Sequence, residues 1–155
     1  MATKKTSTRP AARRSKKRAA RPKRKQPETL QLRGIAPSFT ANDLQRSISW
    51  YRDVVGFTVA DRWERDGQLR GVELRAGNIS FMLGQDDFAK GRDRKKGEGF
   101  RLWCRTAQDI DQLAAQIKAR GGVLEQEPAE QPWGDRTFAI LDPDGFRLTF
   151  AQGRR

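Results

Sequence analysis

Two stretches of the chain repeat one pattern at a constant offset. In each, a short apolar strand leads into an amphipathic helix that begins at an aspartate and ends at a glycine, and shorter strands follow. Asp43 and Asp109 are 66 positions apart, and so are Gly56 and Gly122. A repeated unit of this size cannot bury its apolar face alone. The repeat therefore predicts two half-modules that pack on each other to form one domain.

The first repeat predicts a strand, a helix and three more strands. Residues 32–40 are apolar and contain Pro37, which favours an edge strand or a bulge. Asn42 or Asp43 is expected to cap a helix that ends at Gly56. Its apolar residues recur at helical spacing: Leu44, Ile48, Tyr51 and Val55. The strands that follow are expected over 57–63, around Val72 and Leu74, and over 78–83, with a hairpin turn at Asp66-Gly67.

The second repeat follows a polar linker over 85–98. It predicts a strand over 100–105, a helix over 110–117 and a strand over 123–127. Two further strands, 137–141 and 146–150, are expected to pair across the segment 142–145. Proline and glycine in that segment favour a tight turn, and the spacing of its aspartates lacks the other ligands of a calcium loop.

Charge is concentrated at the N-terminus. Residues 1–30 hold 12 of the 32 Lys and Arg residues and one acid, whereas the rest of the chain is nearly neutral. Such a segment cannot bury enough apolar surface to fold. We expect a disordered basic arm over 1–30 and a folded domain over 31–152. The residues Lys4–Lys25 either bind nucleic acid without sequence preference or serve as a solubilising extension.

The composition excludes several kinds of chemistry. The chain has no histidine, which removes Ser-His-Asp and Cys-His mechanisms and the commonest ligand of catalytic zinc. Its single cysteine, Cys104, forbids an internal disulfide and favours a cytoplasmic location, where we expect it to be a small buried side chain. No secretory signal and no membrane-spanning apolar run is found, so no membrane partner is expected.

Three segments resemble motifs of a known superfamily. DLQRSISWYRDVVGF (43–57) resembles the first-helix motif of the vicinal oxygen chelate superfamily, and PWGDRTF (132–138) with DPDGF (142–146) resembles its closing hairpin. That superfamily includes glyoxalase I, extradiol dioxygenases and bleomycin-resistance proteins. The resemblance implies an α+β fold of paired βαβββ modules, like that of glyoxalase, bleomycin-resistance protein and dihydroxybiphenyl dioxygenase. It also implies two curved four-stranded sheets that each form a cup, and a homodimer.

The resemblance also implies where a metal would lie. Enzymes of the family hold a divalent metal with four His, Glu or Gln side chains, one from each of four strands, and the metal polarises the substrate. Carried over to this chain, those positions fall at Ala36, within 80–82, at Arg101 and at Thr149. None of them is His, Glu or Gln. We therefore expect neither a metal nor another cofactor.

Strand alternation predicts the candidate ligand site. Leu102, Cys104 and Leu148 are expected to pack under a helix, so the residues that alternate with them, including Arg105, face the cup. Arginine grips carboxylate or phosphate groups and tryptophan stacks on flat rings, which suits an anionic or aromatic small molecule. The predicted ligand-binding residues are Arg101, Trp103, Arg147, Thr149 and Trp133.

An alternative interpretation pairs these arginines with Glu73, Glu98 or Asp135, or places them at a dimer interface. Trp133 and Trp63 are alternatively core or loop anchors.

Three functions remain open from the sequence. The first is metal-independent binding or sequestration of a small molecule, as bleomycin-resistance proteins do. The second is a lyase or dioxygenase with an atypical metal site, so catalysis stays an open question. The third is a nucleic-acid-associated protein that binds through its arm and uses the domain for dimerisation. A shared fold does not choose among them.

Overall fold

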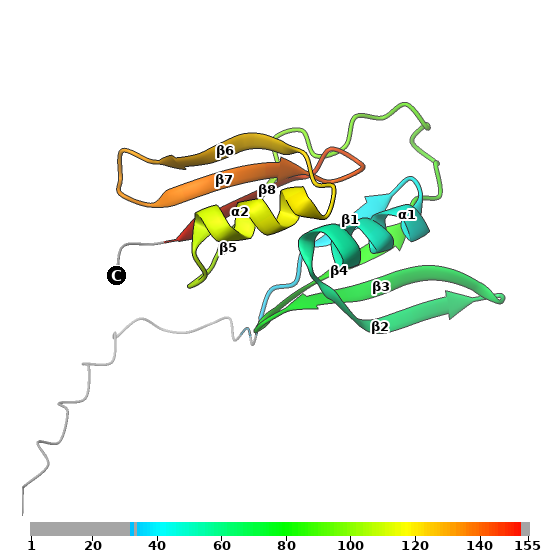
Figure 1. Cartoon of the computed structure of the whole chain (residues 1–155). Helices are drawn as coiled ribbons and strands as arrows, with labels where there is room; N and C mark the ends of the chain where they lie inside the picture. The colour runs from blue at the N-terminus through cyan, green and yellow to red at the C-terminus, as the bar shows by residue number, and fades with distance from the viewer. Residues whose placement is uncertain (1–31, 33, 153–155) are drawn as a thin grey trace, which may run out of the picture. The chain divides into compact units, whose positions relative to one another are not determined.

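The computed structural model describes residue 32 and residues 34–152, so the predicted arm over 1–30 lies outside the described residues. Its elements, labelled in Figure 1, are β1 (Ser38–Ala41), α1 (Leu44–Ser49), η1 (Trp50–Val55), β2 (Thr58–Arg65), β3 (Gln68–Ala76), β4 (Ile79–Gln85), β5 (Arg101–Arg105), α2 (Ile110–Ala119), β6 (Leu124–Glu130), β7 (Arg136–Leu141) and β8 (Arg147–Gln152).

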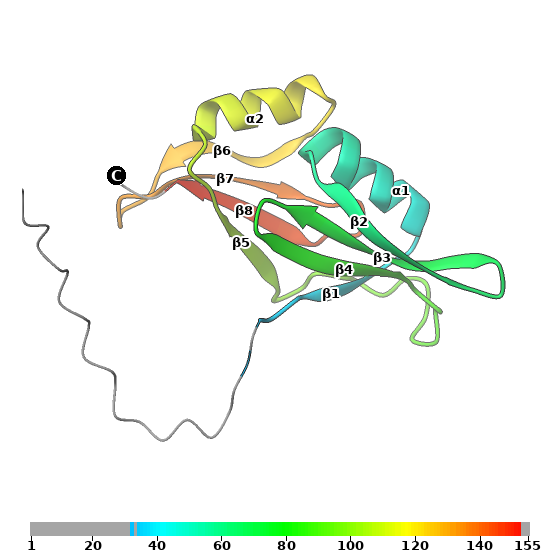
Figure 2. The same cartoon turned by 90° about the horizontal axis from the view of Figure 1, so that it is seen from below.

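The strands form two four-stranded sheets of identical topology. The first has the order β1-β4-β3-β2 and the second β5-β8-β7-β6. In each sheet the first and last strands of the module pair in parallel, and the other pairs are antiparallel. Both helices cover the same side of the two sheets (Figure 2). The predicted α+β fold of paired βαβββ modules is confirmed.

The two repeated aspartates begin the two helices, as predicted. The Asp43 carboxylate accepts a hydrogen bond from the Arg46 N–H at 2.9 Å, and that of Asp109 accepts one from the Gln112 N–H at 2.9 Å. Each thereby satisfies a backbone donor that the first helical turn leaves unpaired. Gly56 ends the first helix in the left-handed region, with a φ of 103°. Local sequence signals therefore fix both helix starts and this helix end.

The first helix changes its hydrogen-bonding pattern halfway. It is α-helical over Leu44–Ser49 and π-helical over Trp50–Val55, where a single α-helix was predicted. The N–H of Gly56 bonds to the carbonyl of Tyr51 at 2.9 Å. A π-helical turn has no dependable sequence signal, because the same apolar spacing serves both geometries.

Two predicted strands differ in bounds for a reason that the structure shows. The strand predicted over 32–40 is shorter, and β1 begins only at Ser38. Pro37 has no N–H to donate, although its carbonyl accepts from the Met82 N–H at 2.8 Å. The strand predicted over 123–127 instead runs over Leu124–Glu130 with two register shifts, and it contains Pro128 at this sheet edge.

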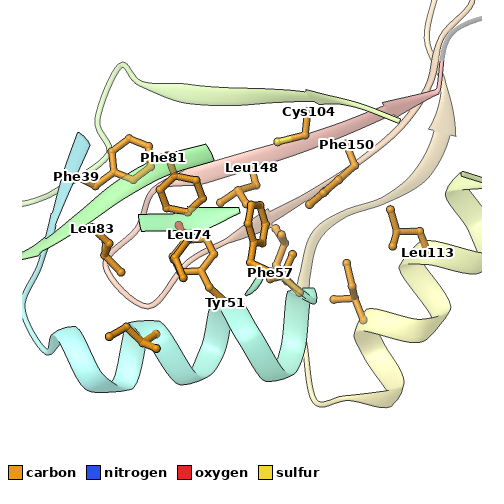
Figure 3. Packing of buried hydrophobic residues seen from close by; sticks show 14 of the residues in the cluster. Phe39, Tyr51, Phe57, Leu74, Phe81, Leu83, Cys104, Leu113, Leu148 and Phe150 are labelled. Carbon is orange, nitrogen blue, oxygen red and sulfur yellow. The ribbon is translucent and has the colours of Figure 1, made fainter. Parts of the chain in front are cut away.

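One apolar core joins the two modules. Phe39 of β1 stacks on Phe146 with ring centroids 4.6 Å apart and meets Phe100 edge-on at 5.4 Å. Tyr51 is fully buried, and its hydroxyl donates to the Asp142 carboxylate at 2.9 Å. Figure 3 shows Tyr51 and Phe81 from the first module beside Leu148 from the second. The predicted packing of one half-module on the other is therefore confirmed.

The segment 142–145 forms the predicted tight turn. One oxygen of Asp142 accepts the N–H groups of Asp144 at 3.0 Å and Phe146 at 2.8 Å, and the other accepts the Tyr51 hydroxyl. Burial raises the pKa of the Asp142 carboxyl above its ordinary value, although these hydrogen bonds counteract part of the rise. Burial also raises the pKa of Tyr51 well above its ordinary value, and the nearby Asp142 charge adds to the rise.

The predicted linker is attached to both modules. The Lys96 side chain is buried, and its ammonium lies 2.7 Å from the Asp86 carboxylate and 4.0 Å from that of Asp144. It also donates to the Thr40 carbonyl at 3.0 Å, and Arg94 donates to Asp86 at 2.8 Å. The Lys96 ammonium, with further hydrogen bonds, holds the pKa of Asp86 well below its usual range. The linker therefore contacts both modules through Arg94 and Lys96, and we call this part of it the strap.

Within the described residues, neither helix is long and apolar enough to cross a membrane.

Candidate functional site

The predicted ligand-binding residues gather on the face of the second sheet that points away from the helices, here called the open face. Arg101 and Arg147 are paired across β5 and β8, and Trp103 is paired with Thr149. Their neighbours Leu102 and Leu148 pack in the core on the opposite face. Alternation along two adjacent strands thus brings two guanidinium groups, an indole and a hydroxyl to one surface.

Arg101 and Arg147 line a hollow of about 380 Å³, here called the basic pocket. Its other lining residues are Lys96, Gly97, Glu98, Gly99, Phe100, Glu125, Leu141 and Gly145. Three basic and two acidic side chains therefore surround it, with apolar surface from Phe100 and Leu141. This is a small site with a net positive lining, which favours an anionic group.

Arg147 is held in place by the edge strand β6. Its Nε lies 2.9 Å from a Glu125 carboxylate oxygen, and its terminal nitrogen donates to the Gln126 side chain at 3.3 Å. The Nε–H does not point at the Glu125 oxygen in hydrogen-bond geometry, so the contact is an ion pair by proximity only. The partners proposed from the sequence, Glu73, Glu98 and Asp135, are therefore wrong for this arginine.

Two indoles extend the open face beyond the basic pocket. The rings of Trp103 and Trp133 lie 6.3 Å apart and are tilted by 48°. Trp133 is 62% exposed, and its indole N–H donates to Asp135 at 3.2 Å. Its exposure shows that Trp133 is not a core residue, whereas its bond to Asp135 is consistent with the alternative prediction of a loop anchor. Trp63 is also partly exposed and lies over Gly71 of the first sheet.

Thr149 places an unsatisfied polar atom on this face. The residue is buried between β5 and β7, and its hydroxyl oxygen has no hydrogen-bond partner within the described residues. A buried hydroxyl without a partner costs about 1–3 kcal/mol. The oxygen is covered by the surrounding protein, so a ligand reaches it only when neighbouring side chains move.

The residues at the expected metal positions do not suit a divalent metal. Those positions hold Ala36, Ser80 or Met82, Arg101 and Thr149, which offer no carboxylate or imidazole, and Arg101 would repel a cation. Within residues 34–152 no three His, Cys, Asp or Glu side chains gather closely enough to hold a metal ion.

Cys104 is buried, as predicted, on the helix-facing side of β5. Burial raises the pKa of its thiol to about 11. Because the thiolate is the nucleophilic form, Cys104 is poorly suited to covalent catalysis at neutral pH.

Among the charged residues that line the basic pocket, sequence reasoning missed Lys96 and Glu125. The position of Glu125 depends on the irregular register of β6, which no local pattern announces. Lys96 belongs to a run of charged residues that resembles a solvated linker, and only its long-range contacts reveal its burial.

A family model described as the Glyoxalase/Bleomycin resistance protein/Dioxygenase superfamily matches residues 35–150. The bleomycin resistance protein of Geobacillus stearothermophilus is 25% identical over 134 residues, which cover 75% of this chain and 93% of that protein. A bleomycin resistance protein of Staphylococcus aureus matches to the same extent.

Solved structures show the same fold. TioX from Micromonospora sp. ML1 superposes with a TM-score of 0.62 at 21% identity, covering 78% of this chain and all of that one. Lactoylglutathione lyase from Agrobacterium tumefaciens superposes with a TM-score of 0.56 at 19% identity, covering 79% of this chain and 95% of that one.

Proposed function

Because the chain belongs to the glyoxalase/bleomycin resistance/dioxygenase superfamily, we propose that it binds a small anionic or aromatic molecule on the open face of its second sheet, without a catalytic metal. The observation that carries the proposal is the pairing of Arg101 with Arg147 at the basic pocket. Both arginines line the hollow, and Glu125 contacts only Arg147, so an anion bound there would be attracted by Arg101 as well.

Each residue has a role in this proposal. Arg101 and Arg147 hold the anionic group, and Glu125 and Gln126 orient Arg147 without neutralising both arginines. Trp103 and Trp133 supply flat apolar surface for a ring beside the charged group. Thr149 supplies an unsatisfied hydroxyl beside Trp103 on the adjacent strand.

Binding and sequestration fit this arrangement better than catalysis. The open face offers cations and aromatic surface, but no histidine, no suitable metal site and no reactive thiol. A bound molecule would therefore be held and shielded rather than transformed. The bleomycin resistance relatives are named for resistance to a small molecule, which supports small-molecule binding as the role of this chain.

The test uses 2-naphthyl phosphate, a planar ring with one anionic group, and follows quenching of the tryptophan fluorescence. Arg147→Ala should weaken binding by about 1.5–3 kcal/mol, the value of a charged hydrogen bond. Arg147→Lys should recover only part of the loss, because lysine cannot form the bidentate contact. Arg70→Ala, an exposed arginine of the first sheet, is the matched control and should leave binding unchanged.

Two further measurements separate binding from catalysis. Elemental analysis after exposure to zinc, nickel, manganese and iron should show far less than one metal per chain. Mass spectrometry should recover the bound molecule chemically unchanged after prolonged incubation. A stoichiometric metal removed by chelators, or steady turnover of the probe, would show that the site is catalytic.

A further inference from the structure

A second hollow of about 560 Å³ lies where the two modules diverge, between the end of η1, the β3–β4 turn and the start of α2. We call it the inter-module cleft. It shares no lining residue with the basic pocket. The cleft is lined by Val55, Gly56, Phe57, Ala76, Gly77, Asn78, Ile79, Cys104, Arg105, Thr106, Ala107, Gln108, Leu113 and Phe150.

The internal repeat explains why this place is open. At the matching place in the other half, the turn 142–145 closes onto the first helix through Asp144. That carboxylate accepts the Asn42 N–H at 2.9 Å and the Ser47 hydroxyl at 3.1 Å. In the second module, the residue that corresponds to Ser47 is Leu113, 66 positions later, and its side chain cannot donate a hydrogen bond. The β3–β4 turn carries only Gly77 and Asn78.

The loop before the second helix adds to the opening. One residue, Asn42, separates β1 from the capping Asp43, whereas three residues, 106–108, separate β5 from the capping Asp109. All three of these residues line the cleft. The longer loop and the missing side-chain contact together leave a cavity where the other half has a closed junction.

The cleft has an apolar floor and a single charge at its rim. Val55, Phe57, Leu113 and Phe150 are buried core residues that also line it, and Figure 3 shows Phe57, Leu113 and Phe150 converging on this region. None of its lining residues is acidic, and Arg105 is the one basic residue. The Arg105 side chain makes no ion pair or hydrogen bond with any other described residue, although its backbone pairs with β8.

We propose that the inter-module cleft is a second binding site, separate from the basic pocket, for a medium-chain fatty acid or a similar apolar carboxylate. The hydrocarbon chain would lie on the apolar floor, and the carboxylate would pair with Arg105. A volume of about 560 Å³ is within the usual range for small-molecule sites. Burial of the hydrocarbon supplies the binding energy, and the unpaired guanidinium selects an acid over a neutral chain.

Cys104 makes this proposal directly measurable. It lines the cleft and is the single cysteine of the chain, so the rate of thiol labelling reports on one position, in the wall of this cavity. Decanoate, kept below its micelle concentration, should slow labelling of the full-length protein by a dithiopyridine reagent at least tenfold at saturation. It should also raise the thermal midpoint, because it binds only the folded state. Decanol should protect at least tenfold more weakly.

Three variants locate the bound acid. Arg105→Gln should weaken decanoate binding about tenfold, and Ala107→Trp, an exposed loop position on the cleft wall, should obstruct it. Arg101→Gln removes a matched exposed arginine from the other end of the same strand and should leave protection unchanged. Absence of saturable protection overturns the proposal. Protection that depends on Arg101 instead of Arg105, or equal protection by decanol, also overturns it.

Discussion

Tyr51→Phe tests the buried hydrogen bond that joins the two modules. The substitution keeps the aromatic ring and removes the hydroxyl that donates to Asp142 at 2.9 Å. One oxygen of Asp142 keeps its two backbone donors, while the other is left buried without a donor. Loss of a hydrogen bond to a charged group costs about 1.5–3 kcal/mol. For a domain of this size, that corresponds to a fall of about 6–12 °C in the thermal midpoint.

The same variant should show a characteristic pH dependence. Burial raises the pKa of Asp142 in the folded state, so the protonated carboxyl stabilises the fold. This contribution to the free energy of unfolding is fully present below the unfolded-state pKa and is lost as the pH rises through the folded-state pKa. The Tyr51 hydroxyl lowers that folded pKa, and its removal should raise it further. The deficit of Tyr51→Phe should therefore be largest at neutral pH and should narrow toward pH 3.

Urea unfolding of both proteins across this pH range gives the free energies. In an Asp142→Asn background the charge is gone, so Tyr51→Phe should cost only about 0.5–1.5 kcal/mol, the value for a neutral pair. A cost below about 0.5 kcal/mol in the native background, constant with pH, would refute the reasoning. It would mean that the carboxylate finds another donor when the hydroxyl is absent.

Three further predictions concern the strap, the dimer and the arm. Asp86→Asn should cost about 3 kcal/mol at pH 7, because it leaves Lys96 buried without its closest anion. Because folding lowers the pKa of Asp86, this carboxylate stabilises the fold above its unfolded-state pKa, and the stabilisation is lost as the pH falls. In urea titrations the wild type should therefore lose more stability than Asp86→Asn between pH 5 and pH 3. Equal losses would contradict this. Light scattering on the full chain should give about twice 17.6 kDa, and a monomer at micromolar concentration would contradict the expected homodimer. Binding to duplex DNA should show a log–log salt slope of roughly −4 to −7, which deletion of residues 1–30 should abolish; equal affinity of the two proteins would assign the arm to solubility.

The parts of the fold that depend on local signals were predictable from the sequence. Aspartate caps and a glycine stop mark the helices, and alternating apolar residues mark which strand faces are buried. Placing Arg101, Trp103, Arg147 and Thr149 on one face needed only the burial of Leu102 and Leu148 between them. These signals involve residues that are close in sequence, so no tertiary information was required.

The remaining features depend on contacts between distant segments. The pairing of Arg147 with Glu125 follows from the register shifts of β6, and the burial of Lys96 follows from its contacts with Thr40 and Asp86. The inter-module cleft exists because the β3–β4 turn makes no contact like that of Asp144 with the first helix. A missing contact of this kind cannot be predicted from the sequence. Such features appear only when the modules are packed together.

The unequal junctions bear on how a repeat of this kind can evolve. If two identical chains of one module each formed a symmetric pair, every substitution would appear at both places where the modules meet. Both junctions would then be closed, or both would be open. Here the Asp144 carboxylate closes one junction, while Leu113 and a longer loop leave the other open. That asymmetry requires two copies encoded in one chain, since only then can one half drift while the other preserves the contact. A fused pair of modules can therefore keep one junction closed while the other stays open.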